Sequence, residues 1–353
     1  MKRPIGESSR AAHHQPVSLT LVYVALTGLL ACVILAGALL GTTHYSPSAI
    51  WSDPEARKIV LQLRLPRILC ALFVGGGLAA VGVAYQALFR NYLASPFTLG
   101  VSSGAALCAS AALVFGVATS QGGVDVGLAA FVGALISIVM IVGIAERISR
   151  SAARSVGGPD SASLLLIGIV FSFFCSSLMT LLQYLADYSQ LFQVTRWMMG
   201  GIPTPGWEDL LVGAICTVLI ASWLWSHARQ LDLMLFGDDL ATVKGLDPIR
   251  FSRSTFVLSS FFVGWVVAQC GVIGFVGIIV PAIARLLVGI SHSRVLPISL
   301  LLGALLVVSC DLLGRVVIAP FEIPAGVFTS VLGGPAFILL LVGKSRPAKG
   351  SVR

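Results

Sequence analysis

Charged residues are scarce in this sequence. Asp, Glu, Lys and Arg together make up 11% of its 353 residues, whereas a soluble domain carries roughly 25%. Hydrophobic residues make up 57%. They come in runs of about 18–25, the length of a helix that crosses a hydrocarbon layer about 30 Å thick. This composition excludes a soluble enzyme or a soluble binding module and predicts an all-α polytopic membrane protein.

Groups that carry catalysis or ion coupling are missing from the apolar runs. All five histidines lie in tails or connections and no H-E-x-x-H motif occurs, so we expect no catalytic group and no metal site. Ion-coupled carriers need acidic side chains within their spans, and here only Asp311 lies well inside one. Arg315 follows one helical turn later, which predicts an ion pair on a single helix face.

A complete nucleotide-binding motif is also missing. Gly343-Lys344-Ser345 resembles the end of a phosphate-binding loop, but Ile338 stands where the first glycine of that loop belongs. An apolar helix, rather than a strand, precedes it. We therefore expect no cofactor bound by this chain, and energy for any uphill transport must come from another subunit.

The cysteines and the net charge point to packing and topology. All seven cysteines fall in or beside apolar runs and none forms a C-x-x-C pair, which is typical of small packing residues rather than metal ligands or disulfides. The net charge of +8 comes from clusters between apolar runs. Nucleic-acid binding, which needs a basic face, is therefore not expected.

Ten apolar runs predict ten transmembrane helices. The first is too long for the hydrophobic region of a cleavable signal peptide, so we expect it to remain in the protein. The stretch 254–289 is too long for one span, and we divide it at Cys270-Gly271. The predicted spans are 17–41, 68–89, 97–118, 124–145, 163–187, 208–226, 252–270, 272–289, 297–318 and 324–343.

An even number of spans places both termini on the same side of the membrane. If that side is the cytoplasm, 17 of the 23 Lys and Arg residues lie inside, as the positive-inside rule requires. The chain then divides into a cytoplasmic tail 1–16, one transmembrane domain 17–343 and a basic cytoplasmic tail 344–353.

Six external cations are exceptions to the positive-inside rule. They are Arg57, Lys58, Arg64, Arg67, Arg196 and Arg315. The simplest interpretation of Arg64 and Arg67 is interfacial anchoring, in which the long side chains reach polar headgroups. Pro66 would then lie in the first turn of the second span, where proline is tolerated.

The connection 227–254 is the longest predicted cytoplasmic stretch between spans. Residues 238–247 predict a short helix with Asp238 or Asp239 near its start and Gly245 as its stop. Apolar residues nearby predict a docking surface for a cytoplasmic protein; a solvated linker is the alternative. These apolar residues are Met234, Leu235, Phe236, Leu240 and Val243.

Longer motifs carry a family resemblance. They are RLPRIL (64–69), QALFRNYLASPFTLGVSSGAA (86–106), LLLIGIV (164–170), LFGDDLATVKGLD (235–247), GVIGFVGIIVPAIARLLVG (271–289) and DLLGRVVIAPFEIPAGVFTSVLGGP (311–335). With these motifs the chain resembles the FecCD-type permeases, the membrane subunits of ABC importers for iron chelates, haem and cobalamin.

The resemblance implies a ten-helix subunit of the bacterial inner membrane, with several partners. A second permease subunit, identical or homologous, would complete a central pathway. Two cytoplasmic ABC ATPase subunits, which bind ATP-Mg, would dock on the connection 227–254. An external substrate-binding protein would dock on the opposite face.

By matching positions, the resemblance also assigns three sets of residues. Those in contact with the ATPase would be Gly237, Asp238, Asp239, Ala241 and Gly245. Those meeting carboxylates of the binding protein would be Arg64, Arg67 and Arg315. Those near a cytoplasmic gate would be Asn91, Leu93, Ser161 and Ser163.

Two positions depart from the family pattern. Tyr92 stands where the family usually has proline, and Ala282 where it usually has histidine. The expected cargo is an iron chelate, a siderophore or haem, with cobalamin as the alternative. From other classes, an ion-coupled secondary transporter lacks acids within the membrane, and a structural scaffold leaves the connection 227–254 unexplained.

Overall fold

Ten apolar helices form the body of the part of the chain that the structure describes. The computed structural model describes residues 19–41, 45–117, 125–152, 161–319 and 321–344, and all regular structure in these ranges is helical. One helix accounts for each predicted span: α1 (Leu19–Leu39), α4 (Leu65–Leu88), α5 (Val101–Val114), α6 (Val126–Ala152), α7 (Ser161–Leu185), α9 (Trp207–Ser226), α12 (Pro248–Cys270), α13 (Val276–Val288), α14 (His292–Val316) and α15 (Ala325–Lys344). Among the described residues, seven helices have the length and apolar composition of a membrane span, and α5, α13 and α15 contribute shorter apolar stretches. The prediction of an all-α polytopic membrane protein is confirmed.

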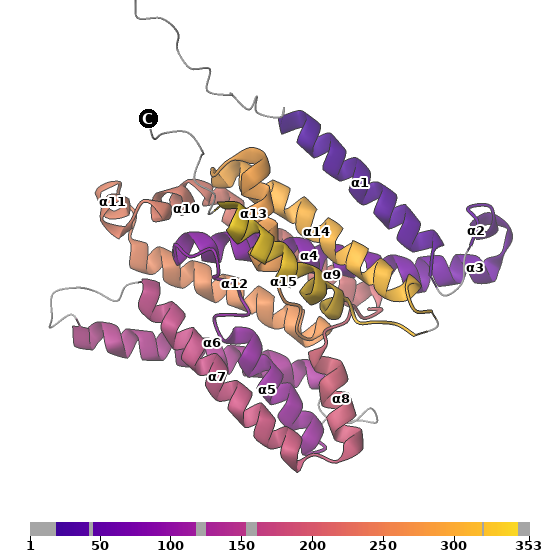
Figure 1. Cartoon of the computed structure of the whole chain (residues 1–353), viewed down its shortest axis with the longest axis horizontal. Helices are drawn as coiled ribbons and strands as arrows, with labels where there is room; N and C mark the ends of the chain where they lie inside the picture. Colours follow the sequence, from indigo (N-terminus) through magenta and orange to yellow (C-terminus); the bar gives the residue numbers. More distant parts are fainter. Residues whose placement is uncertain (1–18, 42–44, 118–124, 153–160, 320, 345–353) are drawn as a thin grey trace, which may run out of the picture.

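Helix α4 lies at the centre of the bundle. It packs against α14, α9 and α13, and Figure 1 shows it enclosed by these helices. At its crossing with α14, Gly75 and Gly303 face each other, and a Cβ atom on either would collide with the carbonyl oxygen of the other. Glycine therefore sets how closely the two backbones approach, as is usual between membrane helices.

The remaining helices form two groups on either side of α12. Helices α5, α6 and α7 pack together, and α12 contacts α5 and α6 on one side and α4 and α9 on the other. Figure 1 shows this separation, with the α5–α8 group below α12 and the α4-centred group above it.

The break between α12 and α13 lies at the predicted position. Helix α12 ends at Cys270, and Gly271 has φ +67°, a conformation that stops the helix. The amide of Gly201 donates to the carbonyl oxygen of Cys270 at 2.8 Å. The division at Cys270-Gly271 is confirmed.

Four features outside the predicted spans appear only in the structure. Residues Pro54–Leu88 form one continuous helix of 35 residues, made of α3 (Pro54–Ile59), the π-helical η1 (Val60–Arg64) and α4. A short helix, α2 (Ala49–Ser52), precedes it. Helix α8 (Tyr188–Met198) lies between α7 and α9 and begins with a capping box of Asp187 and Gln190. Helix α10 (Ala228–Leu235) precedes α11 (Asp238–Val243), and only α11 was predicted.

The polar features gather at the two ends of the bundle. Figure 1 shows α10 and α11 at one end and α2 and α3 at the other. We refer to them below as the α11 end and the α3 end. The predicted tail 1–16 and residues 345–353 of the predicted tail 344–353 lie outside the described residues, and Lys344 is the last residue of α15.

Candidate functional site

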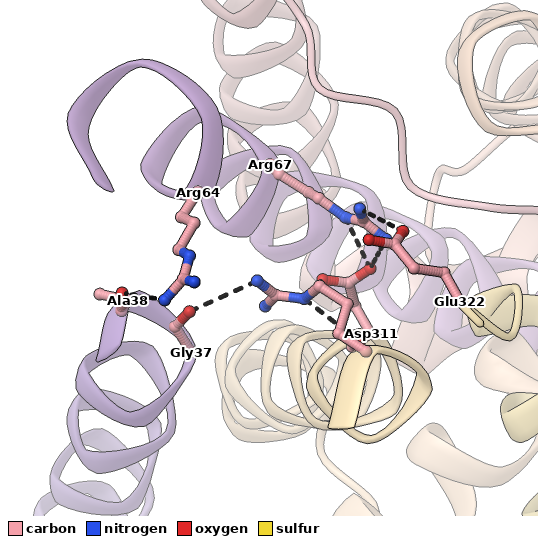
Figure 2. Close-up of polar contacts among 7 residues, drawn as sticks. Gly37, Ala38, Arg64, Arg67, Asp311 and Glu322 are labelled. Carbon is pink, nitrogen blue, oxygen red and sulfur yellow. Dashed lines mark hydrogen bonds and ion pairs between the residues drawn. The ribbon is translucent and has the colours of Figure 1, made fainter. Parts of the chain in front are cut away.

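Three arginines meet at the α3 end. Arg64 comes from η1, Arg67 from the first turn of α4 and Arg315 from the last turn of α14. Figure 2 shows that Arg64 and Arg67 leave the same helix in different directions. Arg64 points to the end of α1, and Arg67 points to Asp311 and Glu322.

Arg64 caps the C-terminus of α1. Its Nη1 donates to the carbonyl oxygens of Ala38 and Leu39, both at 3.0 Å, and its guanidinium lies 5.1 Å from the ring centroid of Tyr45. The last four carbonyl groups of a helix have no partner within it and carry partial negative charge. With the residue only 8% exposed, Arg64 satisfies these groups inside the protein.

Arg315 makes a second connection to α1. Its Nε lies 3.1 Å from Oδ2 of Asp311, which confirms the predicted ion pair on one face of α14. Its Nη1 also donates to the carbonyl oxygen of Gly37 at 3.4 Å. The residue is 4% exposed, so Arg315 holds α14 to α1 within the bundle.

Arg67 links α4 to α14 and to the connection that precedes α15. Its Nη2 lies 2.9 Å from Oδ1 of Asp311, and its Nη1 lies 2.8 Å from Oε2 of Glu322. Asp311 is buried and Glu322 is exposed. Solvent therefore reaches this cluster through Glu322 and through the Arg67 side chain, which is 16% exposed.

The structure brings the three predicted docking arginines together but turns two of them inward. Arg64 and Arg315 satisfy carbonyl groups of α1, a contact that the sequence did not predict. Arg67 is the most exposed of the three. Glu322, which was not predicted, forms an ion pair with it. The docking role stays a prediction, and the geometry favours Arg67 as its focus.

The α11 end contains the predicted coupling residues. Gly237 precedes α11 with φ +110° and ψ +159°, a conformation that is essentially restricted to glycine. Asp238 and Asp239 form the first turn, Ala241 is fully buried, and Gly245 ends the element with φ +84°. The predicted short helix is confirmed, and its role in ATPase contact stays a prediction.

The apolar surface at this end is smaller than predicted. Phe236, Leu240 and Val243 are exposed, Val243 to 83%. The prediction was wrong for Met234, which is fully buried because it packs into the core of the chain itself. Leu235 is half-buried against that core.

Asp232 fastens α10 to the start of α14. Its Oδ1 accepts from the backbone amide of His292 at 2.9 Å and lies 2.6 Å from Nδ1 of the same residue. Burial raises the pKa of Asp232, but the hydrogen bonds from His292 together outweigh burial and hold the pKa below its ordinary value. The carboxylate therefore stays ionised at neutral pH and keeps α10 in place.

The predicted gate residues lie in the turn between α4 and α5. The amide of Leu93 donates to Oδ1 of Asn91 at 2.9 Å, and the carbonyl oxygen of Tyr92 accepts from Nε2 of Gln86 at 3.0 Å. Arg285 of α13 places its guanidinium 5.0 Å from the ring centroid of Tyr92 and also donates to Gln86. The departure at Tyr92 thus supplies a cation–π contact to α13 that proline, which has no aromatic ring, does not make.

The other predicted gate residues begin α7. Ser161 and Ser163 lie in its first turn, and their side chains fall outside the described residues. Ala282, the second departure, is half-buried in α13. Asn91 and Leu93 are thus the two predicted gate residues whose surroundings the structure describes.

Comparison with known proteins gives consistent matches along most of the chain. A model of the FecCD transport family matches residues 29–343. The hemin transport system permease protein HmuU of Yersinia pestis is 36% identical over 325 residues, which cover 91% of this chain and 95% of HmuU. The vitamin B12 import system permease protein BtuC of Escherichia coli is 36% identical over 328 residues, which cover 92% of this chain and 95% of BtuC.

A solved structure has the same fold. It is a metal-chelate type ABC transporter in an inward-facing conformation, which aligns with a TM-score of 0.80 at 31% sequence identity. The alignment covers 92% of this chain and 99% of that one.

Proposed function

The chain belongs to the FecCD transport family, and from that premise we propose that it is the permease subunit of an ATP-driven importer. Its cargo is an iron chelate, a siderophore or haem, delivered by a substrate-binding protein. The chain provides half of the translocation pathway and contains no ATPase site of its own. ATP hydrolysis takes place in two partner subunits.

The observation that carries this proposal is the element α10–α11. It stands at one end of the bundle and exposes Phe236, Leu240 and Val243 beside two acidic residues at the start of α11. An apolar patch that lies outside the spans favours a protein partner. A cytoplasmic ATPase of the ABC type is the partner that the family supplies.

The same proposal orients the chain. The α11 end faces the cytoplasm, where the basic connections gather, and the α3 end faces outward. The binding protein then approaches Arg67 and Glu322, the exposed part of the arginine cluster. A second permease subunit, identical or homologous, completes the pathway in the bacterial inner membrane.

Cobalamin is the second candidate cargo. The identity to the vitamin B12 permease BtuC equals that to the hemin permease HmuU, at 36%. We place the iron chelate first on the resemblance to the FecCD-type permeases. The metal-chelate type structure fits both cargoes, because cobalamin is itself a cobalt chelate. A translocation pathway with few charged residues suits either of these bulky cargoes.

Uptake into proteoliposomes tests the cargo. The complete complex, with its ATPase and binding protein, is reconstituted with ATP on the side of the membrane that carries the ATPase subunits. Haemin, a ferric siderophore or cyanocobalamin is then added on the other side. ATP-dependent uptake of haemin or siderophore supports the proposal. If only cyanocobalamin is taken up, the cargo is cobalamin rather than an iron chelate. If none of the three is taken up in an ATP-dependent way, the proposal is contradicted.

A further inference from the structure

Arg90 joins the end of α4 to the start of α11. Its Nη2 lies 2.5 Å from Oδ1 of Asp238, and both side chains are partly exposed. Arg90 follows Phe89, the residue that caps α4, and Asp238 is the first residue of α11. The ion pair thus connects the central helix of the bundle with the element proposed to hold the ATPase.

Arg90 adopts a backbone conformation that glycine normally occupies. Its φ is +48°, and Phe275 is the other described non-glycine residue with a positive φ. Helices commonly end with glycine in this left-handed region, because a side chain there is sterically costly. What arginine supplies at this position, and glycine does not, is the contact with Asp238.

The start of α11 lies beside the Arg90 side chain. A Cβ atom on Gly237 would lie 3.6 Å from Nη1 of Arg90, in van der Waals contact. Gly237 and Asp238 therefore both adjoin one guanidinium group. A shift of α11 therefore acts on Arg90 directly, through the ion pair with Asp238 and the contact with Gly237.

The residues after Arg90 form a braced turn. The amide of Leu93 donates to Oδ1 of Asn91 at 2.9 Å, and the carbonyl oxygen of Tyr92 accepts from buried Gln86 at 3.0 Å. These bonds tie the turn to itself and to α4. A displacement of Arg90 is therefore passed along the turn to Asn91 and Leu93.

We propose that the Arg90–Asp238 ion pair is the strut through which movement of α11 reaches the gate segment 91–93. This inference rests on the proposed function, in which ATPase subunits hold α11 and Asn91 and Leu93 lie at the gate. Arg90 is a positioning residue: it acts on the gate through the turn that follows it and does not touch the cargo.

The test measures cargo uptake and ATP hydrolysis in the same proteoliposomes. These contain the complete transporter and are supplied with loaded binding protein. In Arg90→Gln, we expect ATPase association and ATP hydrolysis to persist while cargo imported per ATP hydrolysed falls about fivefold or more, the lower bound of typical coupling between sites. Arg90→Lys, which keeps the charge, retains most of the coupling.

A charge reversal tests the pair itself. Arg90→Glu places a carboxylate opposite Asp238 and should lower cargo imported per ATP hydrolysed at least as much as Arg90→Gln does. The matched control is Glu146→Lys, which reverses the acid of another ion pair, between Oε1 of Glu146 and Nη1 of Arg253 at 2.5 Å. This control leaves uptake per ATP unchanged.

Several outcomes overturn the inference. They are unchanged uptake per ATP in Arg90→Gln, loss of ATPase association in that variant, an equal loss in the Glu146→Lys control, and failure of Arg90→Lys to retain coupling. The proposed function fails differently: the wild-type complex then imports nothing when ATP is added. If the wild type imports cargo and Arg90→Gln imports as much cargo per ATP hydrolysed, only the strut is contradicted and the proposed function stands.

Discussion

Arg64 donates two hydrogen bonds to the C-terminus of α1, to the carbonyl oxygens of Ala38 and Leu39, both at 3.0 Å. The buried guanidinium of Arg64 thus has partners inside the protein, whereas the sequence had suggested that Arg64 docks a binding protein. The consequence is that α1, little of which is buried within this chain, is fastened to the bundle at its end.

Replacing Arg64 should loosen α1. Arg64→Ala removes charge-assisted hydrogen bonds, each of which contributes about 1.5–3 kcal/mol, and leaves carbonyl groups at the end of α1 without those donors. We expect a lower Tm of the purified protein and faster proteolysis near residue 41. Arg57→Ala, at an exposed position of α3, serves as the control, and an equal Tm in the two variants would contradict the capping role.

Docking of the binding protein should depend on Arg67 more than on Arg64. Arg67→Glu places a carboxylate beside Asp311 and Glu322 and should weaken docking. The difference in affinity from the wild type should shrink as salt is added, because salt screens the charges that steer association. ATPase binding should be spared. The measurement is the affinity of the immobilised transporter for the binding protein at two salt concentrations.

The matched comparison for docking is Arg64→Gln. It removes a charge that lies 8% exposed and faces α1, so we expect it to lower stability more than docking affinity. If Arg67→Glu binds as tightly as the wild type, the cluster is an internal anchor only.

Gly237 should tolerate no side chain. Its φ of +110° and ψ of +159° are costly for any other residue, by about 1–3 kcal/mol. Gly237→Asp should abolish transport and ATPase association and leave membrane insertion intact. Gly143→Ala is the control, because a Cβ atom there meets nothing within 4 Å. If an ATPase co-purifies with Gly237→Asp at the wild-type level, the coupling role of Gly237 is contradicted.

Asp232 should make the attachment of α10 sensitive to acid. Because its pKa in the folded protein is lowered, it stabilises the fold at pH values above the ordinary carboxyl pKa of about 4, and this contribution is lost as the pH falls through the lowered value. Asp232→Asn should therefore have a lower Tm than the wild type at pH 7, with the difference shrinking below about pH 4. A difference independent of pH would show that the charge does not matter.

Run length and composition were sufficient to predict the ten main helices. The break at Gly271 was also visible, because a single helix over 254–289 exceeds the thickness of a bilayer. Helix α8 escaped prediction because it has only 11 residues, too few for a span, and its sequence is half polar. The extension Pro54–Arg64 escaped because its polar residues end the apolar run on which the second span was predicted.

The contacts that build the sites were beyond a single sequence. Arg67 and Glu322 are 255 positions apart, and Arg90 and Asp238 are 148 apart. Nothing in the spacing of either pair indicates that the fold brings them together. Arg64 leaves even less signal, because its partners are backbone carbonyl groups, which every residue carries. Motif resemblance marked the arginines as functional, but only the three-dimensional arrangement separates the partly exposed Arg67 from the buried Arg64.

The energy source of import tests the central claim most directly. Uptake of labelled chelate is followed in cells that carry the complete transporter, first with ATP depleted and then with the proton gradient collapsed while ATP is maintained. An ATP-driven permease loses uptake in the first condition and keeps it in the second. Uptake that survives ATP depletion and stops when the proton gradient collapses would contradict this account and assign the chain to ion-coupled transport.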